Sequence, residues 1–400
     1  MPHQAGMALA IASFLAFGAL LVLFGANATS LIGELGLDYG DLGLLGSMLS
    51  LGLGVGISIA GPLIDRLPRR PLYLGACGVV MLATTTLGPE TSYLGLLLHT
   101  VAIGLGAGFY ETVLNALVVE TFGTSSPRRL IFAHSAATFA ASATPLLFEW
   151  ARAWTSIPWH ATFRVVGLLH GLLVVAVFFV PMQPPPRHRS PARDPGAAET
   201  VGSAANGHDD RLALAAICVA TFAYVGVESA LTLFIADHAT STLGLDAARA
   251  ARTISAFWGG LLVGRLVIGL SPRPVGAGTT AALAAVAAGV VAGFGLGLFS
   301  TPEIAMAGTG FFLGGVFPIM IGLAGMALPS SAGTAVGLAG GLGSLGGFLV
   351  PWLTGRVATA THLSFGLATL SLWLGLLVVG ATVARWRIRT REDARLRQGG

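Results

Sequence analysis

A carboxylate lies deep inside a long apolar stretch of this chain. Glu111 falls in the run 104–120, and Asn115 follows four residues later, so in a helix both side chains project from one face. A lone carboxylate that faces lipid costs roughly 2.5 kcal/mol or more, so such groups usually face a bundle interior or a water-filled cavity. Burial favours the neutral form of a carboxyl group, and we therefore expect Glu111 to bind and release a proton.

Several other polar residues interrupt apolar segments in the same way. Glu228 follows Tyr224 by four residues, which places both on one helix face, and helical rise places Glu228 at a depth similar to that of Asn27. A histidine side chain can titrate near neutral pH, so His134 is a coupling candidate, and it could also hydrogen-bond a hydroxylated ligand. We expect Glu111 and Glu228 to couple proton movement, and we expect a substrate cavity lined by Asn27, Asn115, His134, Tyr224 and Trp258.

Structural roles compete with these functional ones. Glu111 could hydrogen-bond a neighbouring helix, and His134 lies near a helix end, where a loop could satisfy it. Glu228 could belong to an extracellular gate or a structural pair. Trp258 could stack on a sugar or pack between helices.

The composition excludes an ordinary soluble enzyme. The chain has 400 residues, of which 54% are hydrophobic and 10% charged, against about 25% charged residues in a typical soluble domain. All basic residues are Arg, and they cluster at the ends of apolar segments, so the net charge of +4 is no nucleic-acid signal. Cys77 and Cys218 have no metal or redox spacing. We expect neither a metal nor a cofactor, and no motif indicates an enzyme.

The elements that must position these residues are membrane-spanning helices, which need about 20 apolar residues each. Twelve segments qualify, at residues 8–32, 42–64, 71–88, 93–120, 129–150, 161–181, 212–236, 250–270, 275–299, 303–328, 331–355 and 363–386. Residues 183–210 are rich in Pro, Ala, Gly and charge, as a flexible linker would be. We therefore expect an all-α membrane protein with a six-helix bundle at 1–182, a linker at 183–210, a second bundle at 211–386 and a basic tail at 387–400.

The arginines predict the orientation of the chain. If the N-terminus is cytoplasmic, 16 of the 22 arginines lie on the cytoplasmic side, as the positive-inside rule requires. We expect both termini in the cytoplasm and the protein in the cell membrane.

The loop between the second and third segments carries a recognisable motif. It reads Gly61-Pro-Leu-Ile-Asp-Arg-Leu-Pro-Arg-Arg70 and resembles the signature of the major facilitator superfamily between helices 2 and 3, with Pro68 in place of a Gly. The resemblance implies two pseudo-symmetric six-helix bundles and a functional monomer. It also implies that Asp65, Arg66 and Arg70 form a cytoplasmic gate.

The run 104–147, with its acid, Asn, His and Pro145, looks like helices 4 and 5 of the fucose permease branch, whose members are sugar–proton symporters. The runs 224–238 and 257–269 resemble helices 7 and 8 of that branch, and there the resemblance places Arg265 near the inner gate. The first segment lacks the acid of the branch and offers Asn27 instead. Glu228 could then supply the second titratable group, coupling could depend on Glu111 alone, or transport could be uncoupled.

We expect a secondary active transporter that works by alternating access between its halves, with small solute, proton and lipid bilayer as its partners. The leading hypothesis is proton-coupled symport of a sugar or similar polar metabolite. One alternative is proton-antiport export of amphipathic, drug-like compounds. An alternative from another class is a membrane receptor or scaffold that transports nothing.

Overall fold

The computed structural model describes residues 2–64, 66–122, 126–155, 157–180, 182, 210–271, 275–328 and 331–398. These ranges contain helices and no strand. The first half comprises α1 (Pro2–Leu21), η1 (Gly25–Asn27), α2 (Ala28–Leu35), α3 (Tyr39–Ile64), α4 (Arg69–Thr85), α5 (Tyr93–Phe122), α6 (Ser126–Thr155), α7 (Trp159–Ala176) and η3 (Val177–Phe179). The second comprises α8 (Arg211–Asp237), the π-helical turn η5 (His238–Thr242), α9 (Ala247–Gly269), α10 (Ala277–Gly295), α11 (Pro302–Leu313), α12 (Val316–Ala327), α13 (Ala332–Ala360), α14 (Leu363–Ala368) and α15 (Leu370–Gln398).

The expected all-α membrane architecture is confirmed. Within the described ranges, 11 helical stretches are long and apolar enough to cross a membrane. Helix α4 has 17 residues and a length of about 26 Å at 1.5 Å per residue, so it falls just short of them. Eleven spans and α4 together make the twelve segments that the sequence predicts.

Three segments differ in detail from their predicted form. The first breaks after Leu21 and continues as η1 and α2, and in η1 Gly25 lies directly against the Thr232 carbonyl of α8. The tenth breaks at Gly314 and Gly315, between α11 and α12. The predicted tail is not separate from the last span, since α15 continues to Gln398. The predicted linker lies outside the described residues except for Asp210, which caps α8 by accepting a hydrogen bond from Ala213 N.

Glycines set how closely α3 and α5 approach, and therefore where α5 holds its polar residues. A Cβ at Gly104 or Gly108 would collide with backbone of α3, and one at Gly56 would collide with backbone of α5. Bare backbones can approach where no side chain separates them, and small residues are typical of helix contacts in membranes. This contact fixes α5, with Glu111 and Asn115 on it, against the rest of the first bundle.

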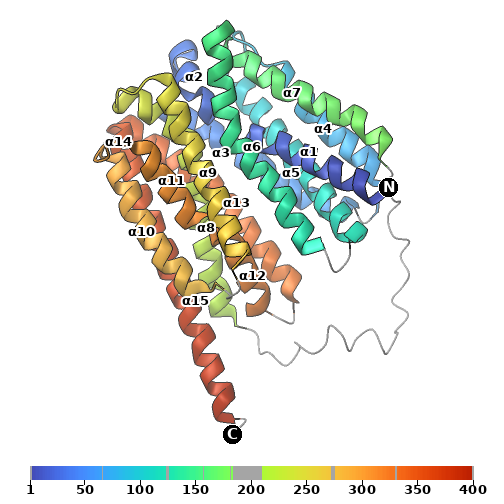
Figure 1. The fold of residues 1–400 in the computed structure, drawn as a ribbon, viewed down its shortest axis with the longest axis vertical. Coiled ribbons are helices and arrows are strands. Elements are labelled where there is room, and N and C mark those ends of the chain that lie inside the picture. Colours follow the sequence, from blue (N-terminus) through green and yellow to red (C-terminus); the bar gives the residue numbers. More distant parts are fainter. Residues whose placement is uncertain are drawn as a thin grey trace.

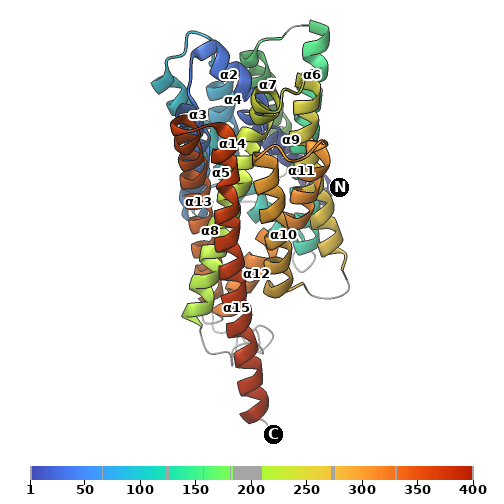
Figure 2. The ribbon, with the colours of Figure 1, turned by 90° about the vertical axis from the view of Figure 1, so that its left-hand side faces the viewer.

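The two halves form bundles that lie side by side, blue to green and yellow to red in Figure 1, while α15 extends beyond the other helices (Figures 1 and 2). We call the end with Asp210 and the last turns of α15 the linker end. The end with α2, η5 and α14 is the far end.

The bundles contact each other at the far end. Thr29 Oγ1 of α2 donates to Asp237 Oδ1 of α8 at 2.9 Å, and Gly40 N of α3 donates to Thr359 Oγ1 of α13 at 2.9 Å. Nearby, Gly355 of α13 lies directly on the Tyr39 backbone of α3.

Toward the linker end the same helices have free space beside them. In α13, a Cβ added at Gly337, Gly340 or Gly341 would meet no atom within 4 Å, and neither would one at Gly61 of α3. Among the described residues, α3 and α13 are therefore in closer contact at the far end than at the linker end.

Substitution of Gly355 should shift this balance. In Gly355→Val, the new side chain collides with the Tyr39 backbone, so the closed far end loses population to an open one by about tenfold or more, equivalent to roughly 1.4 kcal/mol. Spin labels on the exposed residues Glu90 and His362, one in each half at the far end, should show a longer distance component. Gly337→Val, in the same helix but facing open space, is the matched control. An unchanged distance in Gly355→Val would contradict this account of closure.

Candidate functional site

A charged cluster in the second bundle joins α8 to α9. Tyr224 and Glu228 lie one turn apart on α8, and the Tyr224 hydroxyl donates to Glu228 Oε2. Arg265 of α9 places Nη2 at 3.8 Å from the same carboxylate oxygen. Its Nε donates to the Gly314 carbonyl at 3.2 Å, where α11 ends. The charges of Arg265 and Glu228 thus compensate each other inside the bundle.

The facing cluster in the first bundle is uncharged apart from one carboxyl group. Glu111 and Asn115 lie one turn apart on α5 with their side chains in hydrogen-bonding contact. His134 of α6 places Nε2 at 3.2 Å from Asn115 Oδ1 and packs its ring on Phe14, 4.4 Å between centroids. Within the described part of the chain, no cationic side chain forms an ion pair with Glu111.

Thr138 connects the two clusters. Arg265 Nη1 donates to Thr138 Oγ1 at 2.9 Å, across the boundary between the bundles, and the Thr138 hydroxyl donates in turn to the His134 carbonyl at 3.1 Å. Sequence analysis missed Thr138. Its position one turn after His134, on the same helix face, is the signal that could have found it.

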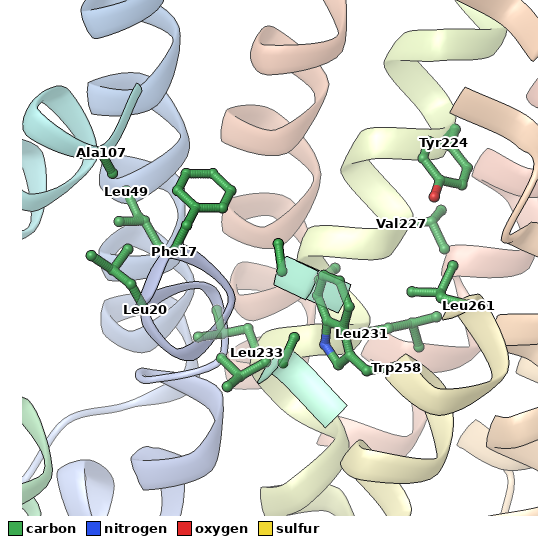
Figure 3. Close-up of a cluster of buried hydrophobic side chains, with 14 of the residues drawn as sticks. Phe17, Leu20, Leu49, Ala107, Tyr224, Val227, Leu231, Leu233, Trp258 and Leu261 are labelled. Atoms are coloured by element: carbon green, nitrogen blue, oxygen red, sulfur yellow. The ribbon is translucent and has the colours of Figure 1, made fainter. Parts of the chain in front are cut away.

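A cavity of about 70 Å³ lies between the bundles and extends from Glu228 toward the far end. Its walls are Leu21, Phe24, Gly25, Gly46, Leu49, Ser50 and Leu53 from the first bundle, and Glu228, Ser229, Thr232, Leu233 and Trp258 from the second. Trp258 is 3% exposed, and its Nε1 has no hydrogen-bond partner among the described residues. Figure 3 shows Trp258 among apolar side chains of both bundles. The cavity therefore offers an indole donor, hydroxyl groups and one carboxylate on an apolar wall.

The structure does not bring Asn27 to this cavity. Its side-chain amide donates to the Leu23 carbonyl at 2.7 Å and to Thr162 Oγ1 at 3.0 Å, and its oxygen accepts from Arg152. All of these partners belong to the first bundle at the far end. Asn27 is thus fully engaged where α1 gives way to η1 and α2.

The predicted gate residues at the linker end are only partly visible. Asp65 lies outside the described residues, and Arg66 is exposed. Arg70 donates from Nη2 to the Val180 carbonyl at 2.9 Å. Among the described residues of this region, buried Arg69 of α4 forms a bidentate ion pair with Glu120 of α5.

Arg265 also lies at a different site from the one expected. We expected it near the inner gate of the second half, and the structure places its guanidinium between Glu228 and Thr138. The other predicted cavity residues fall into the two clusters or, for Trp258, into the cavity wall. Among the residues searched, no group of three or more metal-ligating side chains comes together. The arrangement can hold a proton, compensate charge and hydrogen-bond a solute.

Breaking the Arg265–Glu228 pair should destabilise the protein, because it leaves one charge uncompensated inside the bundle. We expect Arg265→Gln and Glu228→Gln each to cost about 2 kcal/mol of unfolding free energy, and the double variant to recover part of that loss. Thermal unfolding of the purified protein measures both effects. The matched control is the partly exposed pair Arg249–Glu303, 2.8 Å apart at the start of α9 and α11, whose removal should change little. Additive losses in the Arg265/Glu228 cycle would show that the pair does not interact.

The profile of the Major Facilitator Superfamily matches residues 9–351 of this sequence. No curated protein matches it.

Solved structures share the fold over nearly the whole chain. A bacterial homologue of the human lysosomal transporter Spinster, in an inward-facing and occupied conformation, is 17% identical with a TM-score of 0.69, over 97% of this chain and 96% of its own. A D-xylose–proton symporter is 13% identical with a TM-score of 0.72, over 96% and 97%. A bacterial homologue of the human drug peptide transporters PepT1 and PepT2 is 15% identical with a TM-score of 0.73, over 98% and 100%.

Identities this low establish the fold and leave the resemblance to the fucose permease branch a prediction. The family match covers most of the chain, and the helices it covers are those that hold both polar clusters. The protein is a multi-pass membrane protein and a transporter rather than an enzyme. The chain belongs to the Major Facilitator Superfamily.

Proposed function

We propose that the protein is a secondary active transporter that couples the uptake of a sugar or similar polar metabolite to protons by alternating access. It acts as a monomer in the cell membrane, with the linker end and both termini in the cytoplasm. The distribution of arginines supports this orientation, since they concentrate at the linker end.

The observation that carries the proposal is the difference between the two half-buried carboxyl groups, Glu111 and Glu228. Glu228 has Arg265 as a counter-ion, whereas Glu111 has only the amide of Asn115 beside it in the described part of the chain. A carboxyl group without a counter-ion at membrane depth is most stable in its neutral form and ionises where water reaches it. We therefore assign the transported proton to Glu111, with Glu228 as a charge partner.

Alternating access gives Glu111 its two environments. To open the far end, the hydrogen bonds Thr29–Asp237 and Gly40–Thr359 must break while the bundles close at the linker end. The Arg265–Thr138 hydrogen bond crosses the same boundary beside His134, so the movement also changes the surroundings of the proton site. A proton on Glu111 and a solute in the cavity would then change their exposure in the same step.

The cavity supports a solute with one apolar face and several hydroxyl groups. The Trp258 indole can cover the apolar face of a sugar ring and donate from Nε1, while Ser50, Ser229 and Glu228 supply further polar atoms. The likeness to the D-xylose–proton symporter is consistent with this class of solute.

A specific observation also favours the export alternative. Most of the cavity wall is apolar, with Leu49, Leu53, Leu233 and Phe24 among its residues. Such a wall suits an amphipathic compound that leaves in exchange for a proton.

Proton movement in reconstituted vesicles distinguishes these functions. With a pH-sensitive dye inside, external D-xylose, L-fucose or D-galactose should acidify the interior of vesicles that carry the wild-type protein. Glu111→Gln cannot release a proton, so the acidification should disappear. Glu90→Gln removes an exposed carboxylate outside the bundles and is the matched control.

Interior alkalinisation driven by an amphipathic compound would favour the exporter instead. Solute accumulation without any pH change, or acidification that persists in Glu111→Gln, would contradict the assigned role of Glu111.

A further inference from the structure

A second hollow lies far from the transport cavity, at the linker end of the second bundle. Its volume is about 540 Å³, and it is lined by Gly276, Ala277, Gly278, Thr279, Ala282, Leu323, Arg385, Ile388 and Arg389. The small residues that begin α10 form one wall, and two arginines one turn apart on α15 form the other. We call it the α10–α15 groove.

The two arginines give the α10–α15 groove a positive charge that no ion pair among the described side chains compensates. Arg387, on another face of α15, pairs with Asp210 at 3.1 Å, whereas Arg385 and Arg389 form no ion pair among the described residues. Segment 385–397 as a whole carries six arginines against two acidic residues. The groove therefore suits an anion.

Gly278 shapes the groove around Arg385. A Cβ at Gly278 would come within 2.6 Å of Arg385 Cδ and 2.7 Å of Nη1. The glycine thus lets the arginine lie flat against the first turn of α10, with its guanidinium inside the groove. Any larger side chain would have to displace it.

The surface around the groove locates it at the edge of the lipid bilayer. Val379 of α15 is 58% exposed and Val286 of α10 is 50% exposed, as lipid-facing residues are. Trp386, 56% exposed, follows Arg385 directly, and tryptophan is enriched at the level of the lipid head groups. Ala282, which lines the groove, is itself exposed one turn before Val286. The groove is thus continuous with the surface that the acyl chains cover.

We propose that the α10–α15 groove binds the phosphate head group of an anionic phospholipid from the leaflet at the linker end. Arg385 and Arg389 contact the phosphate, and the acyl chains lie along the exposed face of α10. Basic pockets between membrane helices bind anionic head groups by this combination of charge and location. A soluble phosphate is also an anion, but it has no acyl chain that could contact the apolar surface beside the groove.

Lipid retention by the purified protein tests the proposal. Detergent-solubilised protein is mixed with equal amounts of phosphatidylglycerol and phosphatidylethanolamine, and bound lipid is counted by native mass spectrometry. The wild type should retain phosphatidylglycerol preferentially. Arg385→Gln/Arg389→Gln should lower that retention about tenfold. The matched control, Arg164→Gln/Arg356→Gln, removes two exposed far-end arginines and should retain the lipid.

Two further variants test separately whether lipid retention depends on the charge of the groove and on its shape. Arg385→Lys/Arg389→Lys keeps the charge and should retain most of the lipid, whereas Gly278→Leu fills the groove without changing charge and should lose it. Equal retention of both lipids by the wild type, or equal loss in the two Gln variants, would overturn the proposal. Displacement of bound phosphatidylglycerol by inorganic phosphate at equal concentration would show a general anion site and would overturn the lipid assignment.

Discussion

The arrangement depends on one constraint: a charge at membrane depth persists only where another group compensates it. Arg265 is the residue on which this constraint acts most strongly. It meets Glu228 and the Gly314 carbonyl in its own bundle and Thr138 in the other. The partners of the Arg265 guanidinium therefore connect α9 to α8, to α6 and to the break after α11. Glu111 lies outside that compensation, and this difference makes it the candidate proton carrier.

Close helix packing is what makes such a point contact possible. The first bundle fixes α5 against α3 through glycines that leave no room for a Cβ, and the second fixes α9 against α11 in the same way at Gly260 and Gly264. Polar side chains on α5 and α9 are thereby held by rigid backbone. The boundary between the bundles also carries hydrogen bonds, which include Thr29–Asp237 and Gly40–Thr359 at the far end and Arg265–Thr138 nearer the middle. Alternating access requires the bundles to move as units while contacts at their boundary break and form.

Sequence analysis could predict what depends on spacing along one helix. Apolar length located the spanning segments, and four-residue spacing paired Glu111 with Asn115 and Tyr224 with Glu228. It could not predict which helices meet across the bundles, so it missed Thr138 and placed Arg265 at a gate. Asn27 lies in the first predicted segment, near the far end. There the side chain hydrogen-bonds Arg152 and Thr162 instead of facing the cavity. In the predicted gate loop, sequence alone could not tell that Arg69 rather than its neighbours pairs with Glu120.

We assign the transported proton to Glu111 and not to Glu228. Infrared spectroscopy of the carboxyl C=O stretch, as the pH is lowered from neutral to acid, tests this assignment most directly. We expect a protonated-carboxyl band in the wild type that persists in Glu228→Gln and is absent in Glu111→Gln. A band that survives in Glu111→Gln and vanishes in Glu228→Gln would contradict the account and move the proton to the second bundle.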